Sequence, residues 1–96
     1  MSADRACLKS YTACFAIRAN AEPGILPRLI ELFAKRDLVP AAVSARRFGD
    51  EQLAVDLQID GIDRHLAELI AESMRQMVSV ERVLLADLPA DLAERA

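Results

Sequence analysis

The stretch that decides the fold is CFAIRANAEPGILPRLIELFAKRDL, residues 14–38. In its first part apolar residues alternate at a period of two, which is typical of a β-strand. In its second part apolar residues recur every three to four positions, which is typical of a helix with one apolar face. Pro23 and Gly24 separate the two parts. The stretch therefore predicts a strand, a tight turn and a helix in direct succession.

The rest of the chain extends this pattern to six elements. Residues 49–51 read as a hairpin turn, and Asp60 or Asp63 is the candidate N-cap of a second helix. The predicted strands are residues 11–19, 41–48, 52–59 and 81–86, and the predicted helices span residues 24–36 and follow the apolar positions from Ile62 to Met77. This order predicts an α+β fold of the ferredoxin-like βαββαβ type, a four-stranded antiparallel sheet with two helices on one face.

The chain length of 96 residues limits the protein to one domain. We expect residues 1–10 to be a flexible leader, residues 11–86 the folded domain and residues 87–96 a C-terminal tail. For a domain of this size, the free energy gained by apolar burial roughly balances the entropy lost on folding. Association with another subunit would therefore help to stabilise the fold.

Composition and charge exclude several classes of partner. The net charge is −3 and the basic residues are scattered, which argues against nucleic acid and against an anionic membrane surface. No apolar run is long enough to span a membrane, and the N-terminus lacks the apolar core of a secretory signal. The two cysteines, Cys7 and Cys14, are too few for a disulfide scaffold. We therefore predict a cytoplasmic protein with reduced thiols.

No combination of residues indicates catalysis. The single histidine, His65, is expected on the surface of the second helix, and Cys14 is expected to be a small apolar strand residue. The first loop contains no Cys-x-x-Cys pair for a metal, and the strands lack the aromatic platform of an RNA-binding sheet. The prediction is a protein that is not an enzyme, with no catalytic residues, no metal site and no cofactor.

The turn before the first helix has two interpretations. The free amides and the dipole of a helix N-terminus can hold a carboxylate or a phosphate, and Gly24 would let a ligand approach the backbone closely. Alternatively, residues 20–24 are an ordinary connection between a strand and a helix. Pro23 and Pro27 each remove one donor, which reduces the capacity of such a site.

The chain from about residue 12 to residue 86 resembles the ACT domain, and it is most similar in character to the small regulatory subunits of acetolactate synthase. A proline-glycine-aliphatic-leucine turn after a strand, followed by an amphipathic helix with a basic end, carries the resemblance. The matching residues are Pro23, Gly24, Ile25 and Leu26 in the turn, then Leu29, Leu32, Phe33, Lys35 and Arg36.

The resemblance implies a regulatory module that senses an amino acid at a homodimer interface and controls an amino-acid biosynthetic enzyme. ACT domains commonly pair edge strand to edge strand and bind the amino acid at the seam. The implied partners are a second copy, in a homodimer or a higher homo-oligomer, an amino acid, and a catalytic subunit of the enzyme. The implied ligand-binding residues are Asn20, Ala21, Glu22, Pro23, Gly24, Ile25, Leu26, Val39 and Pro40.

Three positions depart from the family pattern. Ala21 and Val39 stand where the family often has Asp or Asn, and Pro40 stands where it often has an aliphatic residue. A binding site that relies on hydrogen bonds is weakened by each missing partner, although Glu22 could accept from an ammonium group instead. The alternative is therefore an ACT-like assembly or interaction module that has lost ligand binding.

Overall fold

A computed structural model describes residues 11–89 of the chain. The elements are β1 (Tyr11–Asn20), α2 (Ile25–Ala34), β2 (Ala42–Phe48), β3 (Gln52–Asp60), α3 (Arg64–Arg75) and β4 (Val80–Pro89). This order confirms the predicted βαββαβ arrangement. Strand β4 runs to Pro89, so it includes the first three residues of the predicted tail. The predicted leader, residues 1–10, and residues 90–96 of the tail lie outside the described part.

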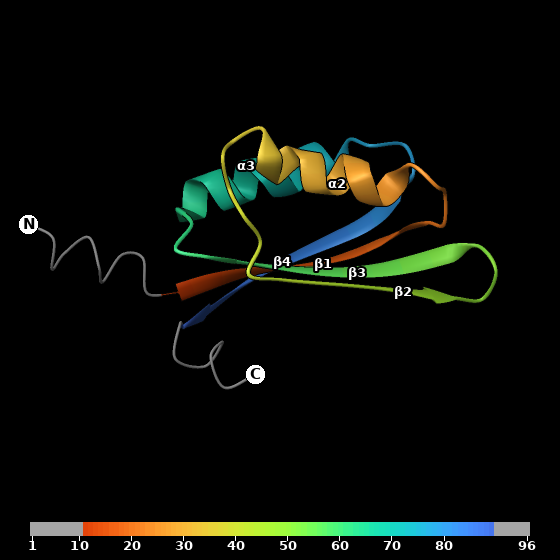
Figure 1. Cartoon of the computed structure of the whole chain (residues 1–96), viewed down its shortest axis with the longest axis horizontal. Coiled ribbons are helices and arrows are strands. Elements are labelled where there is room, and N and C mark those ends of the chain that lie inside the picture. Colours follow the sequence, from red (N-terminus) through yellow and green to blue (C-terminus); the bar gives the residue numbers. More distant parts are fainter. Residues whose placement is uncertain (1–10, 90–96) are drawn as a thin grey trace, which may run out of the picture.

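The four strands form one antiparallel sheet in the order β2-β3-β1-β4. Strands β1 and β3 are central, and Phe15 of β1 pairs with Leu57 of β3 and with Leu85 of β4. Both helices lie over one face of the sheet, and none of the elements in residues 11–89 covers the other face (Figure 1). The predicted ferredoxin-like layer arrangement is therefore confirmed.

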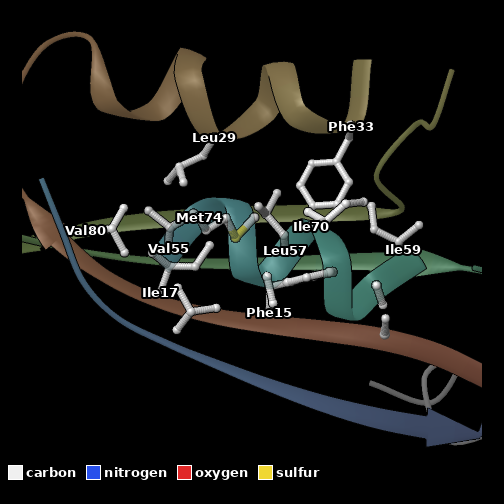
Figure 2. Close-up of a cluster of buried hydrophobic side chains, with 14 of the residues drawn as sticks. Phe15, Ile17, Leu29, Phe33, Val55, Leu57, Ile59, Ile70, Met74 and Val80 are labelled. Atoms are coloured by element: carbon white, nitrogen blue, oxygen red, sulfur yellow. The ribbon is translucent and has the colours of Figure 1, made fainter. Parts of the chain in front are cut away.

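The hydrophobic core lies between the helices and the central strands. Phe33 of α2 packs edge-to-face on Phe15 of β1, with ring centroids 5.3 Å apart and an interplanar angle of 77°. Figure 2 shows Leu29 and Phe33 pointing from α2 towards the sheet. The largest fully buried apolar side chains are those of Phe15, Phe33, Ile25, Leu29, Leu57, Ile59, Ile70, Met74 and Val55.

Two aspartates and one glycine lie where helices and strands begin or end. Asp63 is the N-cap of α3, because its carboxylate accepts a hydrogen bond of 3.2 Å from the amide of Leu66. Asp60, the other candidate, instead ends β3 and accepts a hydrogen bond of 2.7 Å from the hydroxyl of Thr12. Gly49 adopts a φ of 63° in the predicted hairpin between β2 and β3, a conformation that favours glycine.

Strand β2 extends beyond the helix layer. All seven of its residues are exposed, although it pairs with β3 along its length. Val43 projects from the same face as its partner Leu57, yet 46% of its surface is accessible whereas Leu57 is fully buried. No helix within residues 11–89 is long and apolar enough to cross a membrane.

Candidate functional site

The turn between β1 and α2 is held in place from two sides. The amide of Asn20 donates to the carbonyl of Ser79, at 2.8 Å, which ties the turn to the segment before β4. The amide of Ala21 donates to the carbonyl of Glu51, at 2.9 Å, which ties it to the β2–β3 hairpin. These partners lie far away in the sequence, so the turn acquires its position from the tertiary fold.

The side chain of Glu22 is oriented by a buried hydroxyl. Ser79 is 6% exposed, and its Oγ donates to Oε1 of Glu22 at 2.7 Å. The backbone carbonyl of Glu22 accepts from the amide of Ile25 at 3.1 Å, which leads directly into α2. One carboxylate oxygen of Glu22 is therefore engaged by Ser79, and the other is left to accept a further donor.

The anion cradle expected at the start of α2 is small. Gly24 is the N-cap and no side chain caps the helix. The amides of Glu22 and Ile25 already donate to backbone carbonyls of the turn. Within residues 11–89, this leaves the amides of Gly24 and Leu26 without a partner. Gly24 has a φ of −92°, and a Cβ added there would meet no atom within 4 Å. The backbone at Gly24 therefore faces open space.

A cavity of about 310 Å³ opens between this turn and the β2–β3 hairpin. Figure 1 shows the turn and the hairpin at the same end of the molecule. Arg47 of β2 and Leu53 of β3 are directly paired and project to the helix side of the sheet. The lining thus combines a cation, two carboxylates and apolar surface; its residues are Ala21, Glu22, Pro23, Arg47, Asp50 and Leu53.

The structure brings together only part of the set implied by the resemblance. Residues 20–26 form one continuous turn, in which the side chain of Ile25 is 1% exposed and that of Leu26 packs against the core. These two residues can therefore offer a ligand little beyond their backbone. Val39 and Pro40 precede β2 at its other end, about 23 Å away along its seven residues at about 3.3 Å each.

Sequence reasoning did not select the hairpin residues Arg47, Asp50 and Leu53 or the hydroxyl of Ser79. The hairpin itself was predicted, and the alternation in residues 52–59 places Leu53 on the core face. The pairing of Arg47 with Leu53 then follows from the hairpin register. No local signal predicts the contact between Ser79 and Glu22, because 57 residues separate them.

The groups considered for catalysis or metal binding lie apart from this cavity. His65 is exposed near the start of α3. Among residues 11–89, no three or more His, Cys, Asp or Glu side chains are grouped so that they could hold a metal ion. Cys14 lies on the uncovered face of the sheet. Burial, together with the nearby Asp56 and Asp60 carboxylates, raises the pKa of its thiol, so the nucleophilic thiolate is disfavoured.

Two solved domains share this fold. The ACT domain of GTP pyrophosphokinase from Chlorobium tepidum matches at a TM-score of 0.67 with 15% identity, over 78% of this chain and 96% of that one. The C-terminal domain of the MgtC protein from Mycobacterium tuberculosis matches at 0.68 with 8% identity, over 82% and 88%. At these identities the likeness shows the fold alone.

The ligand-free regulatory subunit of aspartate kinase from Thermus thermophilus matches at a TM-score of 0.62 with 11% identity, over 81% of this chain and 51% of that one. Among curated proteins, no sequence matches this chain significantly. The model of the ACT-like domain matches residues 4–92, nearly the whole sequence. ACT domains are regulatory rather than catalytic modules. The chain belongs to the ACT-like domain family, as the resemblance at its Pro-Gly turn predicted.

Proposed function

We propose that this protein senses an amino acid at a homodimer interface and thereby controls an amino-acid biosynthetic enzyme. The observation that carries the proposal is the cavity of about 310 Å³ at the Pro-Gly turn, which displays charges of both signs. A free amino acid carries a carboxylate and an ammonium group, so it is complementary to such a lining. The family membership and the fold shared with a regulatory subunit of aspartate kinase support a regulatory role.

Each part of an amino acid has a partner in the cavity. The guanidinium of Arg47 suits the α-carboxylate, because it can donate two parallel hydrogen bonds. The carboxylates of Asp50 and Glu22 suit the ammonium group, and Ser79 keeps the Glu22 side chain in place. Pro23 and Leu53 offer apolar surface to a side chain. In this proposal, Glu22 and Asp50 replace the acceptor that the family often has at the position of Ala21.

A second copy would complete the site. Strand β2 is an edge strand exposed along its whole length, so it can pair with β2 of another copy. If the two strands run antiparallel, the start of the partner's β2 comes close to the Pro-Gly turn of the first copy. Val39 and Pro40 of one chain would then close the cavity of the other. Binding at that seam would couple the ligand to the geometry of the dimer, and thus to the enzyme that the dimer contacts.

The alternative is an assembly module without a ligand, and one observation favours it. Val39 is an apolar side chain with 85% of its surface exposed, at a position where the resembled family often has Asn. An exposed valine at the edge of a sheet suits a dry contact between subunits better than a hydrogen-bonded ligand. The two functions share the edge-strand dimer and differ in whether the seam is occupied.

Thermal denaturation in the presence of each of the twenty amino acids tests the proposal. A ligand at one hundred times its dissociation constant stabilises the folded state by about 2.7 kcal/mol, which is readily measured as a rise in Tm. We expect one amino acid or a few related ones to raise Tm. The rise should disappear in Arg47→Ala. It should persist in Lys35→Ala, which removes a cation at the far end of α2 from the cavity.

Three further results would decide between the candidate functions or contradict them. Light scattering that gives at least twice the 10.6 kDa chain mass, with no Tm response to any amino acid, would support the assembly module and contradict sensing. A Tm response that Arg47→Ala leaves unchanged would contradict the site. A monomer at high concentration would contradict both functions, because each requires the edge-strand dimer.

A further inference from the structure

The uncovered face of the sheet carries a row of three arginines. Arg18 of β1 pairs with Arg82 of β4, and across Ala54 of β3 the same row reaches Arg46 of β2. Adjacent strands lie about 4.8 Å apart, so three like charges share a short band. None of the three forms a salt bridge with any residue in the range 11–89. The band therefore has no salt-bridge partner within the described residues.

Arg18 lies across the sheet rather than projecting from it. Its guanidinium carbon is 4.3 Å from the centre of the Phe48 ring on β2, a cation–π contact that spans β3. The small side chain of Ala54 leaves room for this crossing. The guanidinium is thereby held over β3 and against β2, where it can meet a group that approaches the sheet from outside.

The row next to the arginines contains one carboxylate. One step along the strands, Asp56 of β3 pairs with Ala16 of β1 and with Ser44 of β2. A hollow of about 260 Å³ lies where the two rows meet. Its lining adds an apolar residue, Leu84 of β4, with 59% of its surface exposed. Beside small residues, Phe48 and the exposed Leu84, the face therefore carries a row of three arginines next to a row that holds one carboxylate, Asp56.

We propose that this face binds the same face of a second copy of the chain, with the strands of the two sheets running in opposite directions. The two-fold axis lies in the plane between the two sheets, runs perpendicular to the strands and passes between the arginine row and the Asp56 row. The arginine row of each copy then faces the Asp56 row of the other copy. Asp56 of one copy then faces Ala54 of the other copy. Because the Arg18 side chain of that other copy extends over Ala54, the carboxylate and the guanidinium come close to each other. The contact occurs twice by symmetry, which is the isologous pattern of two-fold interfaces.

The charge pattern selects this orientation over the alternative. A two-fold axis parallel to the strands would place each row opposite itself, so that two arginine rows would meet and repel. The perpendicular axis instead pairs unlike charges and excludes the like-charged arrangement. The occupant of the face is thus identified by complementarity with the face itself, because each copy supplies the cation, Arg18, and the carboxylate, Asp56, that the other copy needs.

The area of the face is sufficient for a specific contact. Four strands at about 4.8 Å spacing, with ten residues in β1 at about 3.3 Å each, give on the order of 600 Å² per copy. Two copies would bury on the order of 1,200 Å², at the lower end of the range for specific interfaces. Ala16 and Ala54 in the centre allow the two sheets to approach closely, and Leu84 fills space between them.

Charge reversal tests the proposal. In sedimentation velocity over a range of concentrations, Arg18→Glu and Asp56→Arg should each lower the mass of the assembly twofold. The double variant Arg18→Glu/Asp56→Arg should restore the wild-type mass, because it exchanges the two charges. Arg28→Glu makes the same reversal on α2, over the other side of the sheet, and should leave the mass unchanged. Circular dichroism and thermal unfolding check that every variant folds.

This test is independent of the edge-strand dimer proposed above. Val43→Lys places a charge on the β2 edge, so it removes edge pairing and leaves the uncovered face intact. In that background Arg18→Glu should still lower the mass twofold, from dimer to monomer. The proposal is overturned if the single variants keep the wild-type mass, or if the double variant fails to restore it. Stabilisation by inorganic phosphate at unchanged mass would assign the arginine row to small anions and would also overturn it.

Discussion

Strands β2 and β3 are hydrogen-bonded neighbours, yet they have opposite relations to the rest of the protein. Along β3, Val55, Leu57 and Ile59 are buried under the helices while the residues between them are more exposed. Along β2 every residue is exposed, including Val43, which faces the same side as Leu57. The comparison teaches that pairing within a sheet does not by itself bury a strand. The helices bury β3, whereas β2 stays exposed within the described chain.

The two phenylalanines Phe33 and Phe48 give the largest expected contrast between the regions. Phe33 is fully buried against Phe15, so Phe33→Ala should lower the free energy of unfolding by about 3–5 kcal/mol. Phe48 on β2 is 36% exposed, so Phe48→Ala should cost below about 1 kcal/mol, chiefly the contact with Arg18. Urea denaturation of the two variants measures the difference. Equal losses would contradict the assignment of β2 to the outside of the core.

The next contrast compares the two glycine turns that flank the candidate site. Gly49 holds a φ of 63° in the hairpin, so Gly49→Ala should destabilise the fold by about 1–2 kcal/mol. Gly24 has a negative φ and open space around it, so Gly24→Ala should cost less than about 1 kcal/mol, from a poorer N-cap. Thermal unfolding compares them, and a larger loss at Gly24 would mean that the turn is packed more tightly than described.

A variant at Gly24 also tests whether a ligand uses the open backbone. A Cβ added there meets no atom of the chain within 4 Å, so a valine side chain would extend into the space in front of the turn. Gly24→Val should therefore abolish any amino-acid-dependent rise in Tm while the mass in light scattering stays the same. An unchanged rise would show that the ligand does not approach the backbone at this point. A fall in mass would place Gly24 in the subunit contact instead.

A charged residue introduced on β2 should have a smaller effect on stability and a clear effect on assembly. Val43 is 46% exposed, so Val43→Lys should change the free energy of unfolding of a single chain by less than about 0.5 kcal/mol. The charge should nevertheless disrupt edge pairing, and light scattering should report a lower mass. Leu57→Lys, at the paired position on β3, serves as the contrast, because it should prevent folding. A mass that Val43→Lys leaves unchanged would contradict pairing through β2.

The smallest expected effect concerns the thiol on the uncovered face. Burial, and then the carboxylates of Asp56 and Asp60, raise the pKa of Cys14. In a Cys7→Ser background, the labelling rate of Cys14 should therefore rise with pH at a higher pH than that of a free cysteine. Because the folded-state pKa is raised, stability should fall as the pH rises through the unfolded pKa towards the folded one. An inflection at or below that of free cysteine would contradict this description of the thiol.

The sequence predicts the fold because its local signals agree with one another. The alternation in residues 52–59, the helical repeat after Pro23 and the hairpin at Gly49 each indicate the element that the structure contains. The strand at residues 81–86 was predicted too short, because its extension to Pro89 depends on pairing with β1 rather than on a local pattern. Tertiary contacts, which set strand ends, leave little trace in a single sequence.

The candidate site was predictable only in part, for the same reason. The turn at residues 20–26 carries a recognisable motif, and the structure presents it as one continuous surface. The charged residues opposite it, Arg47 and Asp50, belong to another element, and their approach depends on how the hairpin bends towards the turn. Val39 and Pro40 lie at the far end of β2, so a single chain cannot unite the full set. In the proposed dimer, a second copy would bring them to the turn.

Residue-resolved amide hydrogen exchange of β2 tests the central claim most directly. In an isolated chain, β2 has one free edge, so about half of its amides lack a strand partner and should exchange rapidly. If β2 pairs with another copy, both sets of amides should be protected at high protein concentration and should lose protection on dilution. Fast exchange of the outward-facing amides at every concentration would contradict the edge-strand seam on which the proposed sensing depends.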